Sequence, residues 1–194
     1  MPGNNRKPAG RKPPRPVAGG GVAPGPEPHA SLEGDPVTIS FLNKVLKNEL
    51  TAINQYFLHS KMCENWGYRR LAEHDRAESI EEMVHAEKLM QRILFLEGTP
   101  NMTDIGPIRI GANVKAQLES DLELELDALP RLNAAIKKAT ELGDNASREL
   151  FEQILIDEEE HVDYLEGQLH AVGEVGIENY LAQWIHSGKE DEKD

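Results

Sequence analysis

Glutamate and histidine residues recur inside apolar, helix-like stretches of this chain at a constant spacing. Six residues follow the pattern: Glu49, Glu82, His85, Glu125, Glu158 and His161. The first two glutamates are 33 residues apart, the last two are again 33 apart, and each histidine follows its nearest glutamate by three. A shift of 76 residues therefore superposes one half of the pattern on the other. Because residues three or four apart share a helix face, the chain is constrained to two equivalent helical hairpins whose polar groups converge near a pseudo-two-fold axis.

Apolar residues at spacings of three and four predict four long helices and one short one. The expected helices run from about 36 to 65, from the break at Gly67 to 96, from 113 to 142, from 145 to 172, and from Gly176 to about 186. Asp35 can cap the first helix, and Pro36 suits its first position. Residues 98–112 hold two prolines and three glycines without helical periodicity. The pattern predicts an all-α four-helix bundle with one long crossover between helices two and three and a short C-terminal fifth helix.

The six polar residues fall in the middle of the apolar helix faces. A buried carboxylate without a partner is costly, and four of them together would repel and stay protonated unless cations were present. Two divalent metal ions supply that charge. Oxygen and imidazole ligands without thiolate suit iron or manganese, and Glu82 and Glu158 are placed to bridge both ions. The other four would be terminal ligands, paired as Glu49 with His85 and Glu125 with His161.

This ligand set is a known one. One glutamate from each of two helices and a Glu-x-x-His motif from each of the other two is the arrangement described for ferritin-like di-iron proteins. Taken singly, each residue could be an ordinary core or solvated side chain. All six in register predict a ferritin-like fold with a di-iron centre.

Composition restricts partners and compartment. The chain carries 21 Lys+Arg against 34 Asp+Glu, a formal charge of −13, which excludes a nucleic-acid binder that relies on phosphate neutralisation. The single cysteine, Cys63, excludes an internal disulfide and a four-cysteine metal site, and favours a reducing cytoplasm. No run of about 18 apolar residues occurs, so no membrane span is expected.

The chain is expected to divide into three parts. Residues 1–36 contain 9 of the 12 prolines and 7 of the 16 glycines and carry +2, which leaves −15 for the remainder. This composition predicts a disordered basic tail at 1–34, which is either a solvated extension or an arm that anchors a partner or a surface. The di-iron domain is expected at 35–187 and a charged C-terminal tail at 188–194.

Four segments resemble the bacterioferritin family, and the resemblance extends over residues 34–186. They are 48–59 (NELTAINQYFLH), 78–86 (ESIEEMVHA), 92–98 (RILFLEG) and 157–161 (DEEEH). The resemblance implies an iron-storage protein in which twenty-four subunits, built from dimers, form a hollow shell. Each subunit would oxidise Fe(II) to Fe(III) at its own di-iron ferroxidase centre, with dioxygen or hydrogen peroxide, and pass it to a mineral core. The implied iron ligands are the same six residues.

The resemblance also implies haem b. In the family, the methionine between the bridging glutamate and the histidine ligates a haem shared across the dimer two-fold axis, and Met83 occupies that position. It follows Glu82 by one residue and is therefore turned about 100° from the metal face. Residue type alone favours packing for a helical methionine. Tyr56, about two turns from Glu49, suits a radical or hydrogen-bonding role beside the ligands, or core packing.

The chain departs from the family pattern in three places. Where family members can place a histidine and an aspartate as an accessory iron site on the cavity wall, this chain has Ala77 and Glu81, which weakens that site. The tail has no counterpart in the usual member. Pro130 lies inside the third expected helix, where it should free the Leu126 carbonyl and kink the helix locally.

Other functions built on the same ligands remain open. A manganese catalase-like enzyme or a di-iron oxygenase could use the same six residues, although nothing in the sequence identifies a pocket for an organic substrate. A DNA-protecting mini-ferritin places its iron site between subunits, which the six in-chain ligands contradict. A rubrerythrin-type electron carrier needs four cysteines, which this chain lacks.

Overall fold

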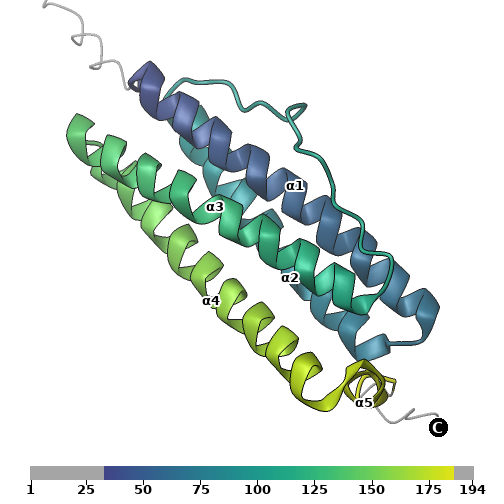
Figure 1. Cartoon of the computed structure of the whole chain (residues 1–194). Coiled ribbons are helices and arrows are strands. Elements are labelled where there is room, and N and C mark those ends of the chain that lie inside the picture. The colour runs from purple at the N-terminus through teal and green to yellow at the C-terminus, as the bar shows by residue number, and fades with distance from the viewer. Residues whose placement is uncertain (1–32, 186–194) are drawn as a thin grey trace, which may run out of the picture. The chain divides into compact units, whose positions relative to one another are not determined.

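The computed structural model describes residues 33–185, which form a bundle of four long helices with a short helix across one end (Figure 1). The helices are α1 (Pro36–Trp66), α2 (Arg69–Phe95), α3 (Val114–Leu142), α4 (Asn145–Val175) and α5 (Ile177–Ala182). No strand occurs among these residues. The predicted fold class is confirmed, with the crossover between α2 and α3. The expectations for residues 1–32 and for the C-terminal tail lie outside the described residues.

Helix ends follow the local signals in the sequence. The Asp35 carboxylate accepts a hydrogen bond from the Val37 N–H at 2.8 Å, and Pro36 opens α1. Gly67, with φ at 90°, ends α1 in the left-handed conformation that glycine adopts most easily. Gly143 ends α3 in the same way, with φ at 72°. The α3 helix runs unbroken through Pro130. No described helix is both long and apolar enough to cross a membrane.

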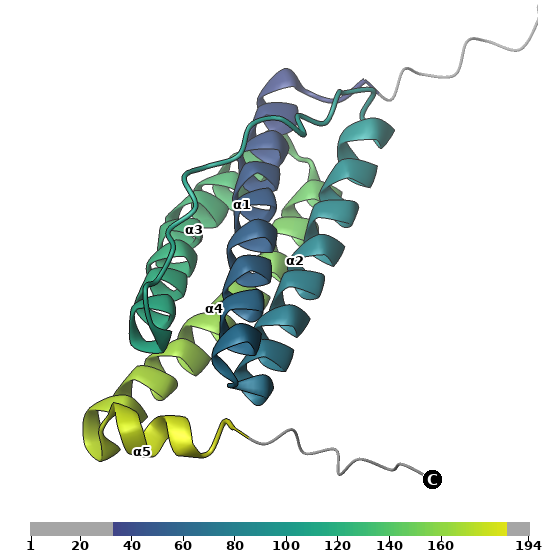
Figure 2. The ribbon, with the colours of Figure 1, turned by 90° about the vertical axis from the view of Figure 1, so that its right-hand side faces the viewer.

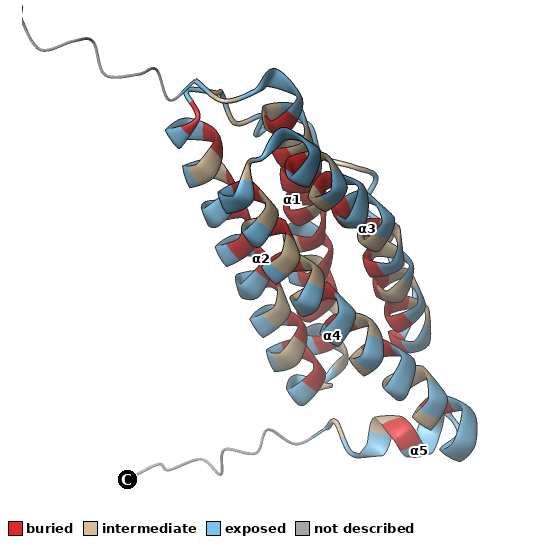
Figure 3. Ribbon diagram, turned by 90° about the vertical axis from the view of Figure 1, so that its left-hand side faces the viewer, coloured by how far each residue is buried: buried red, intermediate tan, exposed pale blue. Residues whose placement is uncertain are grey.

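The core consists of two apolar clusters at opposite ends of the bundle. One contains Leu42, Leu89, Leu132 and Phe151, and the other contains Leu71, Leu118, Leu165 and Tyr180. Burial is concentrated on the helix faces that turn toward one another (Figure 3). Along α2, α3 and α4, the buried glutamates and histidines of the six lie between the residues of the two clusters, and on α1 Glu49 lies beside Leu50, at the inner end of the first cluster. A layer of buried polar side chains therefore crosses the middle of the bundle.

The crossover lies along α1 (Figure 2), held there by a stripe of side chains spaced by four residues: Asn43, Lys47, Thr51, Gln55 and His59. The last three accept hydrogen bonds from consecutive parts of the crossover backbone. Thr51 Oγ1 takes the Gly106 N–H at 2.8 Å, Gln55 Oε1 takes the Arg109 N–H at 2.9 Å, and His59 Nε2 takes the Gly111 N–H at 3.3 Å. This polar stripe, residues 43–59 at every fourth position, replaces the helical hydrogen bonds that the crossover lacks.

Candidate metal centre

All six residues singled out from the sequence spacing lie buried in the polar layer. The α1 and α3 helices each bring one glutamate, while α2 and α4 each bring a glutamate and a histidine. Glu82 is completely buried, and the most exposed of the six, His161, is 8% exposed. The apolar clusters on either side exclude bulk water from the layer.

The six residues form two groups that share two members. Glu49, Glu82, His85 and Glu158 each offer a ligand atom within 4.8 Å of the others, and so do Glu82, Glu125, Glu158 and His161. Glu82 and Glu158 belong to both groups. Two neighbouring ions with two shared carboxylates would satisfy this arrangement.

Both histidines turn the same ring nitrogen toward the glutamates. His85 Nδ1 lies 3.2 Å from Glu82 Oε2 and 3.3 Å from Glu49 Oε2. His161 Nδ1 lies 3.2 Å from Glu158 Oε2 and 3.5 Å from Glu82 Oε1. The atom that each imidazole offers to the centre is therefore Nδ1.

The outer ring nitrogens meet carboxylates that the sequence spacing did not single out. His85 Nε2, on α2, lies 2.9 Å from Asp157 Oδ2 on α4. His161 Nε2, on α4, lies 3.0 Å from Glu78 Oε2 on α2. Each histidine is thus oriented by a carboxylate of the opposite helix, an arrangement that fixes ring orientation and raises ligand basicity in metal sites.

Burial and like charge act on the terminal glutamates. The pKa of Glu49 is raised well above 4.5 by burial and by the neighbouring carboxylates of Glu158 and Glu82. The pKa of Glu125 is raised for the same reasons. Without cations, these groups hold protons that a metal ion would displace.

In Glu82 and the two histidines, the neighbouring opposite charges favour the charged form instead. Burial opposes ionisation of Glu82, but the neighbouring imidazoles of His161 and His85 outweigh it and lower the pKa of Glu82 to about 2. Burial also opposes the imidazolium of His85, yet the neighbouring carboxylates of Glu49 and Glu82 raise its pKa to about 11. The pKa of His161 is raised by Glu158, Glu78 and Glu82 despite burial. Protonated imidazoles thus supply, in the metal-free protein, the positive charge that this site requires.

Two buried carboxylate oxygens test whether metal ions fit. Glu49 Oε2 and Glu82 Oε1 accept no hydrogen bond, although a histidine Nδ1 lies 3.3 Å and 3.5 Å away, respectively. Buried carboxylate oxygens in proteins are normally hydrogen-bonded or bound to metal. The donor set, all oxygen and imidazole, suits iron or manganese.

Tyr56 reaches the centre from α1. Its hydroxyl donates a hydrogen bond to Glu125 Oε1 at 2.5 Å. Burial, followed by the charges of Glu125 and Asp121, raises the pKa of the Tyr56 hydroxyl well above 10. Of the two roles left open for Tyr56, the geometry supports a hydrogen-bonding one.

Met83 lies outside the metal centre. Its side chain is 46% exposed on α2, beside the exposed apolar residues Ile80 and Val84. Ala77 offers no ligand atom, whereas Glu81 is exposed and its carboxylate lies near His161 and His85. The two residues of the weakened accessory site are thus unequal, since only Glu81 has donor atoms.

The structure adds Asp157 and Glu78 to the residues that shape the centre. A partial signal for Asp157 existed in its position directly before Glu158, and for Glu78 in its position one turn before Glu82. Neither signal separates an inward carboxylate from the exposed acids beside it, such as Glu159 and Glu81. Only the packing of α2 against α4 makes the distinction.

Comparison with known proteins agrees with the fold and the site. Residues 39–174 match the ferritin-like domain of the family called Ferritin. The bacterioferritin of Mycolicibacterium paratuberculosis is 50% identical over 154 residues, or 79% of this chain and 97% of that protein. Bacterioferritin BfrA of Mycobacterium tuberculosis H37Rv is 51% identical over the same shares, and the bacterioferritin of Streptomyces coelicolor is 45% identical over 82% of this chain and 96% of its own. With its buried carboxylate and imidazole cluster, the chain belongs to the bacterioferritin family of ferritin-like proteins.

Proposed function

We propose that this chain is a ferroxidase subunit of an iron-storage protein, which oxidises Fe(II) to Fe(III) and deposits it as a mineral inside a hollow shell. The observation that carries this proposal is the buried cluster in which two four-residue groups share Glu82 and Glu158. Membership of the bacterioferritin family supports the same function.

Six residues would hold the iron: Glu49, Glu82, His85, Glu125, Glu158 and His161. Two bound Fe(II) ions supply one electron each to dioxygen or hydrogen peroxide. The remaining contribution of the chain is to bind, to orient and to manage protons.

Proton management begins at the histidines. A histidine ligand must be deprotonated at its ligating atom, so loading expels the Nδ1 protons of His85 and His161. Their Nε2 atoms keep their protons: His85 Nε2 is hydrogen-bonded to Asp157, and His161 Nε2 forms an ion pair with Glu78 at 3.0 Å. The Tyr56 hydroxyl donates to one oxygen of Glu125, so the other oxygen would be the one to bind an ion. Two-electron reduction of either oxidant consumes two protons, and loading releases protons at the same place.

The protein's charge supports delivery of the substrate. A formal charge of −13 attracts Fe(II) and raises its concentration at the surface. We further propose that twenty-four copies, built from dimers, form the shell, and that it works in the cytoplasm. The single buried thiol, Cys63, suits a reducing compartment.

Met83 is our proposed ligand for haem b. Its exposed thioether lies in an apolar patch with Ile80 and Val84, and two copies facing each other across a two-fold axis would present two thioethers to one haem. The reduced-state absorption spectrum of Met83→Leu should lose the haem bands, whereas Met90→Leu, on the same helix but half-buried, should keep them. Haem at full stoichiometry in Met83→Leu would refute the assignment.

Stopped-flow Fe(II) oxidation tests the ferroxidase. Glu82→Ala and His85→Ala should abolish the fast phase while the particle still assembles, and Glu159→Ala, an exposed acid next to Glu158, should leave it intact. Unchanged Fe(II) oxidation kinetics in both ligand variants would refute the assignment of these residues to a ferroxidase centre. A native particle that is only a monomer or dimer without mineral would favour another di-metal enzyme, such as a manganese catalase-like protein or an oxygenase.

A further inference from the structure

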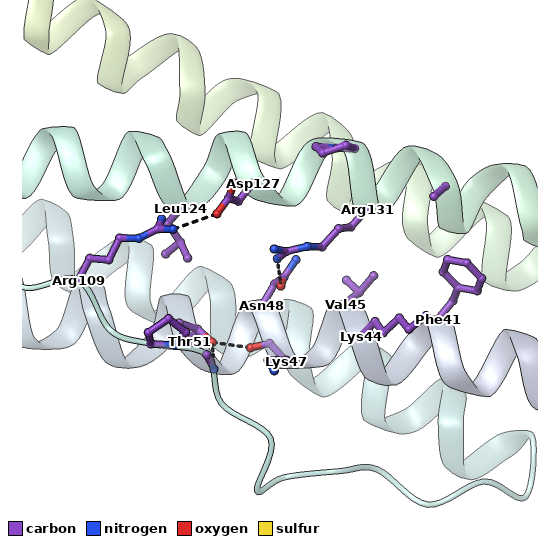
Figure 4. Close-up of a pocket in the computed structure, with 14 residues that line it drawn as sticks. Phe41, Lys44, Val45, Lys47, Asn48, Thr51, Arg109, Leu124, Asp127 and Arg131 are labelled. Atoms are coloured by element: carbon purple, nitrogen blue, oxygen red, sulfur yellow. Dashed lines mark hydrogen bonds and ion pairs between the residues drawn. The ribbon is translucent and has the colours of Figure 1, made fainter.

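A groove of about 620 Å³ lies between α1, α3 and the crossover, outside the metal centre (Figure 4). Its floor is largely apolar, formed by Phe41, Val45, Leu124, Pro107, Pro130 and Ala134. One wall of the groove is the crossover. Its position against α1 is fixed by the hydrogen bond that Thr51 Oγ1 accepts from the Gly106 N–H at 2.8 Å. The groove is a feature of the folded subunit that the ferroxidase chemistry does not use.

Four cationic side chains surround this groove: Lys44, Lys47, Arg109 and Arg131. Two of them are neutralised. Lys47 Nζ lies 2.7 Å from Asp104 Oδ1, and Arg109 Nη2 lies 3.1 Å from Asp127 Oδ2. Asp127 is the one acid among the residues that line the groove, and Arg109 already engages it.

The other two cations have no acidic partner among the described residues. Lys44 Nζ lies over the Phe41 ring, 4.8 Å from its centroid. Arg131 Nη1 donates to the neutral amide oxygen Oδ1 of Asn48 at 2.6 Å, which holds the guanidinium over the groove (Figure 4). The remaining N–H groups of Arg131 are free to bind an acceptor, and a guanidinium suits a carboxylate or a phosphate.

Lys44 and Arg131 place two cations without an acidic partner beside one apolar floor, in a chain of formal charge −13. Other exposed cations among the described residues, such as Lys88 and Lys137, also lack an ion pair, but Lys44 and Arg131 line the same groove. Small-molecule sites combine an apolar lining with a few polar groups that fix orientation. The groove has that composition, with positive charge as the polar part.

We propose that this groove binds a small organic anion, with its carboxylate or phosphate at Arg131 and Lys44 and its apolar body on the Phe41, Val45 and Leu124 floor. The site is separate from the metal centre. It lies beside the turns of α1 and α3 that carry Glu49 and Glu125, since Asn48 directly precedes Glu49 and Asp127 follows Glu125 by two residues.

Isothermal titration calorimetry on the assembled, metal-free particle tests the proposal with four probes. Phenyl phosphate and benzoate carry both parts of the expected ligand, inorganic phosphate carries only the charge, and benzyl alcohol carries only the apolar body. We expect one or both aromatic anions to bind at least tenfold more tightly than phosphate, and benzyl alcohol not to bind. The comparison of benzoate with phenyl phosphate identifies the preferred acid.

Charge-removing variants locate the site. Arg131→Gln and Lys44→Gln should each weaken binding of the better anion about tenfold or more, whereas Lys61→Gln, an exposed α1 cation outside the groove, should not change it. Circular dichroism and particle size confirm that the variants fold and assemble. The proposal would be overturned if neither aromatic anion bound to the unmodified particle, or if both groove variants bound the better anion as tightly as the unmodified particle does. Equal affinity for phosphate and phenyl phosphate would overturn the role of the apolar floor. Fe(II) oxidation is measured separately, so failure here leaves the ferroxidase untouched.

Discussion

The side chain of Gln55 connects the crossover to two helices. Its Oε1 accepts the backbone N–H of Arg109 at 2.9 Å, and its Nε2 donates to Asp121 Oδ1 at 2.8 Å. Asp121 in turn meets His59 Nδ1 at 2.9 Å. Gln55 is fully buried, so water cannot replace the hydrogen bonds by which this amide joins α1, α3 and the crossover.

Replacing Gln55 by alanine should therefore loosen the crossover. A buried donor and acceptor left without partners cost about 1–3 kcal/mol of unfolding free energy. We expect faster amide hydrogen exchange in residues 106–111 and a lower urea midpoint. Asn54→Ala is the matched control, because its exposed side chain bonds only to its own helix, at Leu50 O. Equal exchange rates in the two variants would contradict the prediction.

The metal-free protein should lose stability as pH rises from neutral to alkaline. The folded-state pKa of His85 is raised from 6.5 to about 11, so its stabilising contribution is complete below pH 6.5 and is lost as pH rises through about 11. Glu49 and Glu125 act in the same direction, because their pKa values are raised above 4.5. The lowered pKa of Glu82 contributes only on the acid side, below pH 4.5.

Thermal midpoints of the metal-free particle at pH 6, 7.5 and 9 measure this slope. Bound divalent metal requires the deprotonated ligands, so a metal-loaded sample should gain stability relative to the metal-free one as pH rises. A Glu49→Gln, Glu125→Gln double variant should flatten the metal-free slope. A metal-free midpoint that stays constant or rises between pH 6 and 9 would contradict the raised pKa values of the histidines and glutamates.

Asp157 and Glu78 should control metal affinity without contacting the metal. Losing the carboxylate that orients a histidine ligand typically weakens metal binding 10- to 100-fold. We expect that loss for Asp157→Ala and Glu78→Ala in a Co(II) titration followed by absorbance, with partial recovery in Asp157→Asn. Asp163→Ala, an exposed acid on α4, is the control. Co(II) affinity within twofold of the unmodified protein in both alanine variants would exclude an orienting role.

The start of α4 offers a test of local stability. The Asp144 carboxylate accepts the Ser147 N–H at 3.0 Å and pairs with Arg92 Nη2 of α2 at 2.7 Å. Asp144→Ala removes the cap and should lower the free energy of unfolding by about 1 kcal/mol. Asp144→Asn keeps a good cap and loses only the ion pair, so its unfolding midpoint should lie between the alanine variant and the unmodified protein. If the asparagine variant were as unstable as the alanine variant, the loss of stability would come from the ion pair with Arg92 and not from the helix cap.

The fold and the members of the polar cluster could be predicted because each rests on a period. Apolar residues at three and four define the helices, and the 76-residue shift places Glu49 and Glu125 on equivalent faces. The partners of the outer histidine nitrogens could not be predicted. Asp157 is one of four consecutive acids, and only the position of His85 on another helix distinguishes it.

The polar stripe on α1 shows the same limit. Thr51, Gln55 and His59 are spaced by four residues, which is visible in the sequence. Their purpose depends on where the crossover runs, and residues 98–112 carry no periodicity that reports it. The groove beside Arg131 cannot be predicted from the sequence for the same reason, since its floor combines residues from three segments far apart in the chain.

The 76-residue shift relates the six ligands to one another, but it does not relate the residues around them. The residue 76 positions after Tyr56 is Leu132, which cannot donate a hydrogen bond. The side chain of His161 is 10% exposed, whereas that of His85 is 1% exposed. Two ions held here would therefore occupy unequal sites. The site at His161 would lie closer to solvent than the site at His85. We expect two different residence times. The ion at His85 should stay bound through many oxidation cycles, and the ion at His161 should dissociate first.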